Sequence, residues 1–152
     1  MPEQETLERA RRDKRAGKAP STQAGEFVRE EMDHIREGKH GARSTKQAIA
    51  IGLSKARRAG VDLPAPPSGS KASTKRSAAS ASRAGRHGRK KTSPKRSRAT
   101  RTALKREGRQ AASRKSLARQ ARSAARRRSP AARRQSARKA ARTRQRRRRA
   151  SA

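Results

Sequence analysis

The bulky apolar residues of this chain lie almost entirely in its first 63 residues, which limits what the rest can fold into. Apart from Met1, that part holds ten of them: Leu7, Phe27, Val28, Met32, Ile35, Ile49, Ile51, Leu53, Val61 and Leu63. The other 89 residues hold two, Leu104 and Leu117. Because buried apolar surface has to offset the entropy lost on folding, we expect a core in the first part only.

Charge changes at the same point in the chain. Residues 1–62 carry 14 Lys and Arg against 10 Asp and Glu, whereas residues 63–152 carry 32 against the single acid Glu107. A large cationic excess on a segment without a core is typical of an arm that binds a polyanion. The sequence therefore predicts a nearly balanced head, residues 1–63, followed by a disordered basic tail, residues 64–152.

The head is expected to be all-α, with helices at about residues 3–16, 22–37 and 45–59. The second of these has an apolar face and stops at Gly38. The third begins with an S-x-x-Q capping box at Ser44–Gln47. Together they predict a short helical hairpin of marginal stability, which self-association, a partner or packing of the first helix would support. By itself the first helix has one bulky residue and is expected to be solvated.

The tail is expected to begin with a Pro- and Ser-rich linker near residues 64–70 and to continue as low-complexity Ala, Ser, Arg and Lys. Pro130 separates residues 110–129 from residues 131–149. Ala and Arg favour helix, so both stretches are expected to become helical once phosphates neutralise them. Otherwise, repulsion between like charges is expected to keep them extended.

Nucleic acid is the expected partner of the tail, with DNA favoured over RNA. Exchange of condensed counterions for Lys and Arg drives such binding without reading bases, and the tail has no aromatic residue to stack on them. The residues expected to contact phosphates are Arg83, Arg86, Arg89, Lys90, Lys91, Lys95, Arg96, Arg98, Arg101, Lys105, Arg106, Arg126, Arg127, Arg128, Arg133, Arg134, Arg146, Arg147, Arg148 and Arg149.

The tail and the head each resemble known proteins. Ser93-Pro94-Lys95-Arg96 resembles the S-P-basic-basic turns of linker-histone tails, and residues 70–152 are similar in composition to those tails and to bacterial histone-like proteins. This resemblance implies DNA binding and compaction. The segment GEFVREEMDHIREGKHGARSTKQAIAIGLSKARRAG resembles a small uncharacterised bacterial family whose members carry it before a basic tail. That likeness implies a domain boundary near residue 64 and no function.

The loop at residues 38–44 is a candidate phosphate site in the head. Gly38 and Gly41 form a GxxG between two helices, and Lys39, His40, Arg43 and Ser44 supply charge and helix-start amides. An ordinary glycine-containing helix–helix turn explains the same residues. A KH domain is disfavoured because no strand pattern flanks the loop, and core packing explains the apolar spacing more simply than a DNA-reading helix–turn–helix.

Catalysis and metal binding find no support in the sequence. There is no cysteine, and His34, His40 and His87 lack the spacing of common zinc sites. The glycines near residue 40 do not form a nucleotide-binding P-loop. We expect no enzyme activity, no cofactor and no small-molecule substrate. No apolar run is long enough to cross a membrane, so none is expected as a partner.

The function predicted from the sequence is sequence-independent DNA binding with nucleoid compaction or bridging, in the cytoplasm at the nucleoid. Two alternatives stay open: an RNA- or ribosome-associated basic protein, and an adaptor whose head binds a protein. The head is expected to self-associate or to bind a protein partner. Its oligomeric state, any base preference and regulation by phosphorylation are open at this stage.

Overall fold

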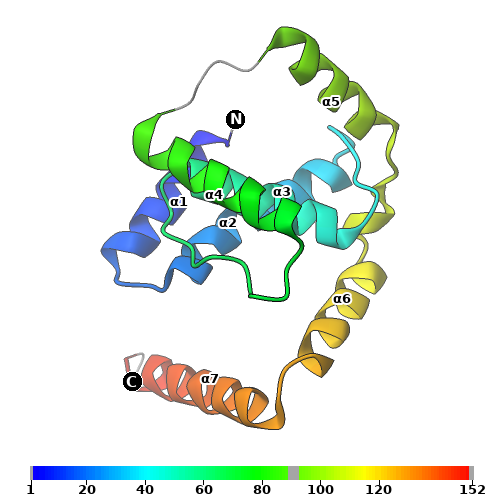
Figure 1. The fold of residues 1–152 in the computed structure, drawn as a ribbon. Coiled ribbons are helices and arrows are strands. Elements are labelled where there is room, and N and C mark those ends of the chain that lie inside the picture. Colours follow the sequence, from blue (N-terminus) through cyan, green and yellow to red (C-terminus); the bar gives the residue numbers. More distant parts are fainter. Residues whose placement is uncertain (1, 89–92, 151–152) are drawn as a thin grey trace. The chain divides into compact units, whose positions relative to one another are not determined.

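The computed structural model describes residues 2–88 and 93–150, and every regular element in these ranges is a helix (Figure 1). The α-helices of the described residues are α1 (Gln4–Arg15), α2 (Pro20–Arg36), α3 (Thr45–Arg58), α4 (Ala72–His87), α5 (Pro94–Arg106), α6 (Arg114–Arg126) and α7 (Pro130–Ala150). A short 3-10 helix, η1 (Arg109–Ala112), lies between α5 and α6. The contacts group residues 1–116 into one compact unit and residues 117–152 into a second.

Local signals explain where the helices of the head begin. α2 starts at Pro20, whose fixed φ suits the first helical position. α3 starts after Ser44, whose Oγ accepts a hydrogen bond from the amide of Gln47 at 3.2 Å. The Gln47 side chain in turn accepts one from the amide of Arg43 at 2.8 Å. The S-x-x-Q pattern thus satisfies two backbone donors at the start of α3.

The close approach of α2 and α3 depends on small residues. A Cβ atom on Gly52 would lie 2.7 Å from the Cα of Val28, nearer than real Cβ atoms come. Ala48, one turn earlier on α3, is fully buried. The two helices therefore form a hairpin in which backbone lies almost directly against backbone.

The core of the head combines large and small side chains. Its buried members are Ala10, Ala24, Phe27, Ala56 and Val61, and Leu7, Leu53 and Leu63 pack against them. Leu7 and Ala10 belong to α1, which packs on α2. The first helix is therefore docked through a leucine and an alanine rather than solvated.

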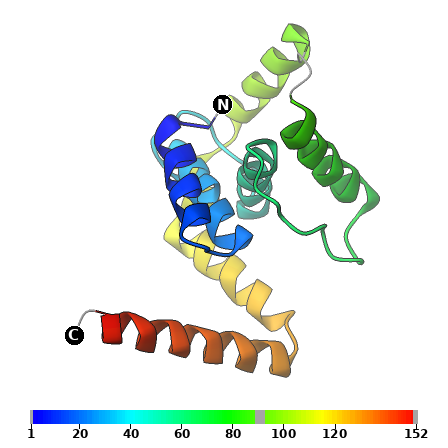
Figure 2. The same ribbon diagram turned by 90° about the vertical axis from the view of Figure 1, so that its left-hand side faces the viewer.

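The expectation of a long disordered tail is wrong, because the described residues after the head form four further α-helices. The first of them, α4, lies beside α3 (Figure 2). Ala81 is buried in this contact, and a Cβ on Gly85 would overlap the carbonyl oxygen of Arg57. A count of bulky side chains misses such packing, since it depends on small residues that let backbones approach.

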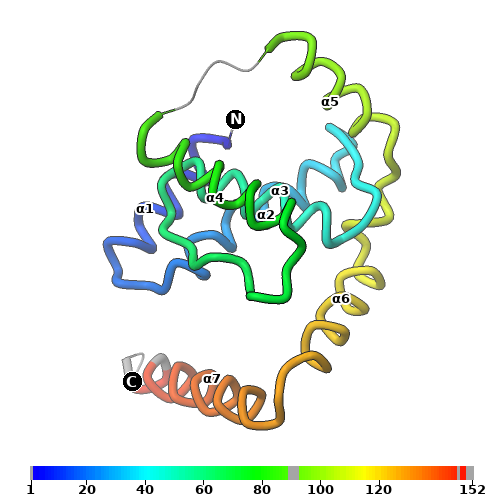
Figure 3. The backbone as a smooth tube through the Cα atoms, in the orientation of Figure 1, coloured from blue at the N-terminus to red at the C-terminus, as the bar shows by residue number. Residues whose placement is uncertain are grey.

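Residues 104–112 lie against the loop between α2 and α3 (Figure 3). The amide of Gly41 donates to the carbonyl of Leu104 at 2.9 Å, and the amide of Ala42 donates to the carbonyl of Gly108 at 3.2 Å. Thr45 Oγ1 donates to the carbonyl of Ala111 at 2.7 Å, and this alanine is buried. Backbone hydrogen bonds of this kind leave no hydrophobic pattern in the sequence, so the docking was not foreseen.

The second unit is also helical, in place of the extended conformation expected from charge repulsion. Ser129 caps α7 by accepting a hydrogen bond from the amide of Ala132 at 3.2 Å, and Pro130 takes the first helical position. Ala and Arg are among the best helix formers. Repulsion between like charges four residues apart costs only about 0.2–0.5 kcal/mol per pair, which helix propensity and capping can offset.

Candidate nucleic-acid interface

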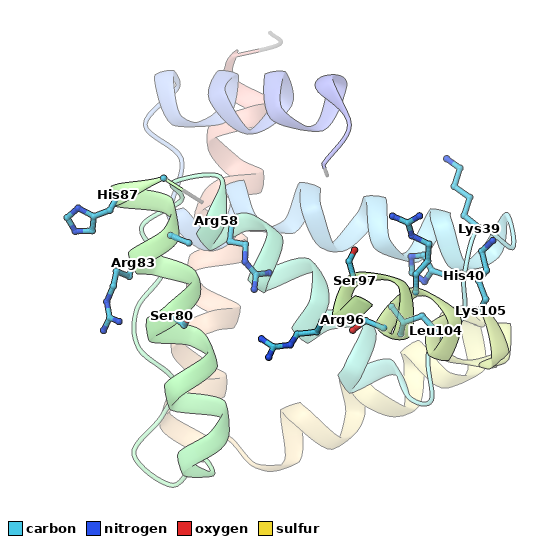
Figure 4. A pocket seen from close by; sticks show the side chains of 14 residues that line it. Lys39, His40, Arg58, Ser80, Arg83, His87, Arg96, Ser97, Leu104 and Lys105 are labelled. Atoms are coloured by element: carbon cyan, nitrogen blue, oxygen red, sulfur yellow. The ribbon is translucent and has the colours of Figure 1, made fainter. Parts of the chain in front are cut away.

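A cationic cavity of about 890 Å³ lies between α3, α4, α5 and the loop that follows α2 (Figure 4). Its lining includes six Lys and Arg side chains: Lys39, Arg58, Arg83, Arg96, Arg101 and Lys105. His40, His87 and three hydroxyl residues complete the polar part, and no Asp or Glu is among the described residues that line it. A cavity with this lining is suited to phosphate groups.

Helical spacing explains how α5 forms one wall of this cavity. Ser97, Arg101 and Leu104 recur at intervals of three and four residues, so they lie on one face of α5. The carbonyl of Leu104 accepts the Gly41 hydrogen bond, which fixes that end of α5 to the loop. The other face of α5 also carries cations, because Lys95, Arg98 and Arg106 line a second hollow. α5 therefore presents positive charge on two sides.

Most cations of this cavity have no carboxylate partner among the residues that the structure describes. In the described part of the first unit, every ion pair joins groups between Glu3 and Lys55. Lys39 is the exception in the lining, since its Nζ lies 3.0 Å from Glu37 and 3.1 Å from Glu3. Hydrogen bonds to the Glu37 and Glu3 carboxylates hold the pKa of Lys39 above its ordinary value.

The second unit is more basic still. Of its 36 residues, 15 are Lys or Arg and none is Asp or Glu. Ten of these cations lie on the 21 residues of α7. At about 1.5 Å per residue α7 is about 31 Å long, so it carries roughly one cation per 3 Å. Each strand of duplex DNA carries one phosphate per about 3.4 Å of the helix axis, which is a similar charge density along the axis.

The structure places the predicted phosphate-contacting residues on exposed surface wherever it describes their side chains. Arg83 and Arg86 lie on α4, six residues lie on α5 and Arg126 on α6, while Arg127 and Arg128 lie just after α6. The other described members, Arg133, Arg134, Arg146, Arg148 and Arg149, lie on α7. Arg89, Lys90 and Lys91 lie outside the described residues, as does the side chain of Arg147, although its backbone belongs to α7. The cavity brings together only Arg83, Arg96, Arg101 and Lys105 from this set.

The structure does not bring together the four residues of the candidate phosphate site in the head loop. Lys39 and His40 line the cavity, whereas Arg43 and Ser44 do not belong to its lining. Ser44 is engaged as the cap of α3, and His40 lies 3.3 Å from Glu31. Arg58 joins the cavity instead, although it is not among the residues expected from the sequence to contact phosphates.

Comparisons with known proteins bear on the head alone. A sequence model of a family of unknown function (DUF6496) matches residues 4–66, so the head is similar to a family with no assigned role. No curated protein and no solved structure matches the chain significantly. No helix among the described residues has both the length and the apolar character needed to span a membrane.

Proposed function

We propose that this protein binds nucleic acid without regard to base sequence and bridges or compacts it, with duplex DNA as the target. The observation that carries the proposal is the set of exposed cations on α4, α5 and the second unit. In the first unit these cations have no carboxylate partners among the described residues. Exposed cations without carboxylate partners, such as those of the first unit, gain free energy when phosphates replace small counterions.

Two separate surfaces support bridging rather than simple coating. One is the cavity in the first unit, where α4 and α5 contribute cations from two walls. The other is α7, on which Arg133, Arg138 and Lys139 lie in three different directions around the axis at 3.6 residues per turn. Cations on several sides of one helix can contact more than one duplex.

We propose DNA as the target because the composition of residues 70–152 resembles that of linker-histone tails. The physical argument itself applies to any polyphosphate. Competition between duplex DNA and duplex RNA of the same length therefore belongs in the test, and a clear preference for RNA would move the proposal to that target.

Salt dependence is the direct measurement. Six phosphate contacts predict a slope of log affinity against log salt of about −5, and a loss of roughly 10³-fold between 50 and 200 mM salt. Mixed-sequence duplexes of equal length should bind alike. Affinity that does not respond to salt, or that varies strongly among unrelated sequences, would refute the proposal.

A charge-matched pair of variants locates the interface. Replacing Arg96, Arg101 and Lys105 by Gln removes three cations from the cavity and should reduce the salt slope by roughly 3. The control replaces Arg11, Arg12 and Arg15 by Gln, which removes three cations from α1, where Glu5 and Glu8 lie beside them. Equal losses in both variants would mean that net charge, not this interface, governs binding.

A further inference from the structure

Glu31 is a buried carboxylate that the described residues satisfy only in part. Its side chain is fully buried on α2, and neither oxygen has a hydrogen-bond partner of good geometry. Lys55 Nζ lies 2.8 Å from Oε2, so that oxygen has a charged neighbour. Oε1 has no such ammonium group. A buried carboxylate oxygen left in this state costs free energy unless a cation or a donor faces it.

The group that faces Oε1 is His40, and its neutral ring cannot donate there. Nδ1 of His40 lies 3.1 Å from the carbonyl of Gly41, which can only accept, so Nδ1 carries the proton. Nε2 is then an acceptor, and it lies 3.3 Å from Glu31 Oε1. In this tautomer two acceptors lie 3.3 Å apart, and the Glu31 oxygen is buried, which favours a cation between them.

His34 supplies a third group at the same place. It lies one turn after Glu31 on α2, and one ligand atom from each of Glu31, His34 and His40 lies within 4.8 Å of the other two. Ligands at about 2.1 Å from one tetrahedral ion are roughly 3.4 Å apart. The separation of 3.3 Å between His40 Nε2 and Glu31 Oε1 already agrees with that geometry.

The surroundings provide the outer hydrogen bonds that metal ligands require. Nε2 of His34 donates to Glu3 Oε1 at 2.8 Å, and the Gly41 carbonyl fixes the ring of His40. The ion pairs around the group join four carboxylates to only two ammonium groups, those of Lys39 and Lys55. Only Glu30 and Glu31 among these four are buried, and both share the ammonium group of Lys55, so the buried carboxylates outnumber their ammonium partners by one.

We propose that Glu31, His34 and His40 bind a divalent transition-metal ion of the zinc type. Two imidazoles and one carboxylate favour zinc over Mg²⁺ and Ca²⁺, which prefer oxygen ligands. His40 also lines the cationic cavity (Figure 4), so the ion has a path from solvent. The ion would tie the loop after α2 to that helix, immediately before the Gly41 amide that holds Leu104.

The test uses the full chain without a histidine tag, freed of nucleic acid, with Zn²⁺ alone as the probe. Equilibrium dialysis should give one tightly held Zn²⁺ per chain, and the melting temperature should rise with Zn²⁺ but not with Mg²⁺. His40→Ala and Glu31→Gln should each weaken Zn²⁺ binding by more than the roughly 10–100-fold that loss of an orienting partner costs. His87→Ala is the matched control, because His87 is exposed on α4 outside the group; its Zn²⁺ affinity should not change.

Protonated histidines are the competing explanation, since two imidazolium groups would neutralise the same charge. That arrangement predicts no stoichiometric Zn²⁺ at neutral pH, and such a result would overturn the proposal. Equal loss of Zn²⁺ binding in His87→Ala and His40→Ala would overturn it too. If a variant fails to fold, proton NMR of Co²⁺ bound to the unaltered protein decides, because imidazole ligands give strongly shifted ring-proton signals; a Co²⁺-loaded protein without such histidine signals refutes the site.

Discussion

Gly41→Ala should detach residues 104–112 from the head. A Cβ at this position would overlap the carbonyl of Glu107 and lie 2.8 Å from the carbonyl oxygen of Gly108. Both are backbone atoms, so no side-chain rotation can relieve the contact. The hydrogen bonds at stake are those donated by Gly41, Ala42 and Thr45. At about 0.5–1.5 kcal/mol each, their loss amounts to roughly 1.5–4.5 kcal/mol.

Hydrogen exchange measures this loss directly, because two of the donors are backbone amides. At about 1.4 kcal/mol per factor of ten, exchange at residues 41 and 42 should become roughly 10–1,000-fold faster in the variant. Gly25→Ala is the control, since its Cβ would meet nothing within 4 Å and lies in α2. Alanine should stabilise that helix by about 0.5–1 kcal/mol. Unchanged exchange at residues 41 and 42 in Gly41→Ala would refute the docking.

The remaining predictions concern the polar interior, α4 and α7. Lys55→Met should lower the free energy of unfolding by roughly 3–5 kcal/mol in urea titrations, since it leaves two buried carboxylates without their shared ammonium group. Burial raises the pKa of Glu30, but hydrogen bonds from Lys55 and the Glu3 amide outweigh this and hold it below its ordinary 4.5. The contribution of ionised Glu30 to the stability of the protein is therefore present above pH 4.5 and should be lost as the pH falls further. Calorimetry at several pH values should show a smaller loss of stability in Lys55→Met. Gly85→Ala should expose α4 to proteolysis, because the new Cβ meets the Arg57 carbonyl; intact protease resistance would contradict this. Deleting α7 should reduce both the salt slope and the pelleting of DNA, whereas unchanged pelleting would remove α7 from bridging.

The hairpin of the head was accessible to sequence reasoning because its signals are local. An apolar stripe, a glycine stop and a capping box each act within a few residues. Ser44 accepts the hydrogen bond from Gln47 that the pattern predicts, while the Gln47 side chain accepts from the amide of Arg43, one residue before the cap. The tail was misjudged for a related reason. Its packing uses Ala81, Ala111 and backbone carbonyls, none of which stands out when bulky residues are counted.

The group of Glu31, His34 and His40 was missed because ligand spacing was judged along the sequence. The Glu-x-x-His pair on α2 was a usable signal, since residues three apart share a helix face. The third ligand was not accessible in this way. His40 faces α2 only because the loop turns back after Gly38, which has a φ of +79°.

The fold separates charge as strictly as the sequence does. Eight of the ten acids in residues 1–62 form ion pairs, all with cations of the same part of the chain. None of these ion pairs involves a described residue of α4 or α5, and the one acid further along, Glu107, forms no ion pair with a described residue. The phosphate proposal and the metal proposal concern excess charges of opposite sign. An excess of cations on the helices after the head requires an external anion, while an excess of carboxylates around His34 and His40 requires a cation. Because different residues create the two excesses, Zn²⁺ binding and the salt slope on DNA can fail independently, and each measurement tests its own half of the argument.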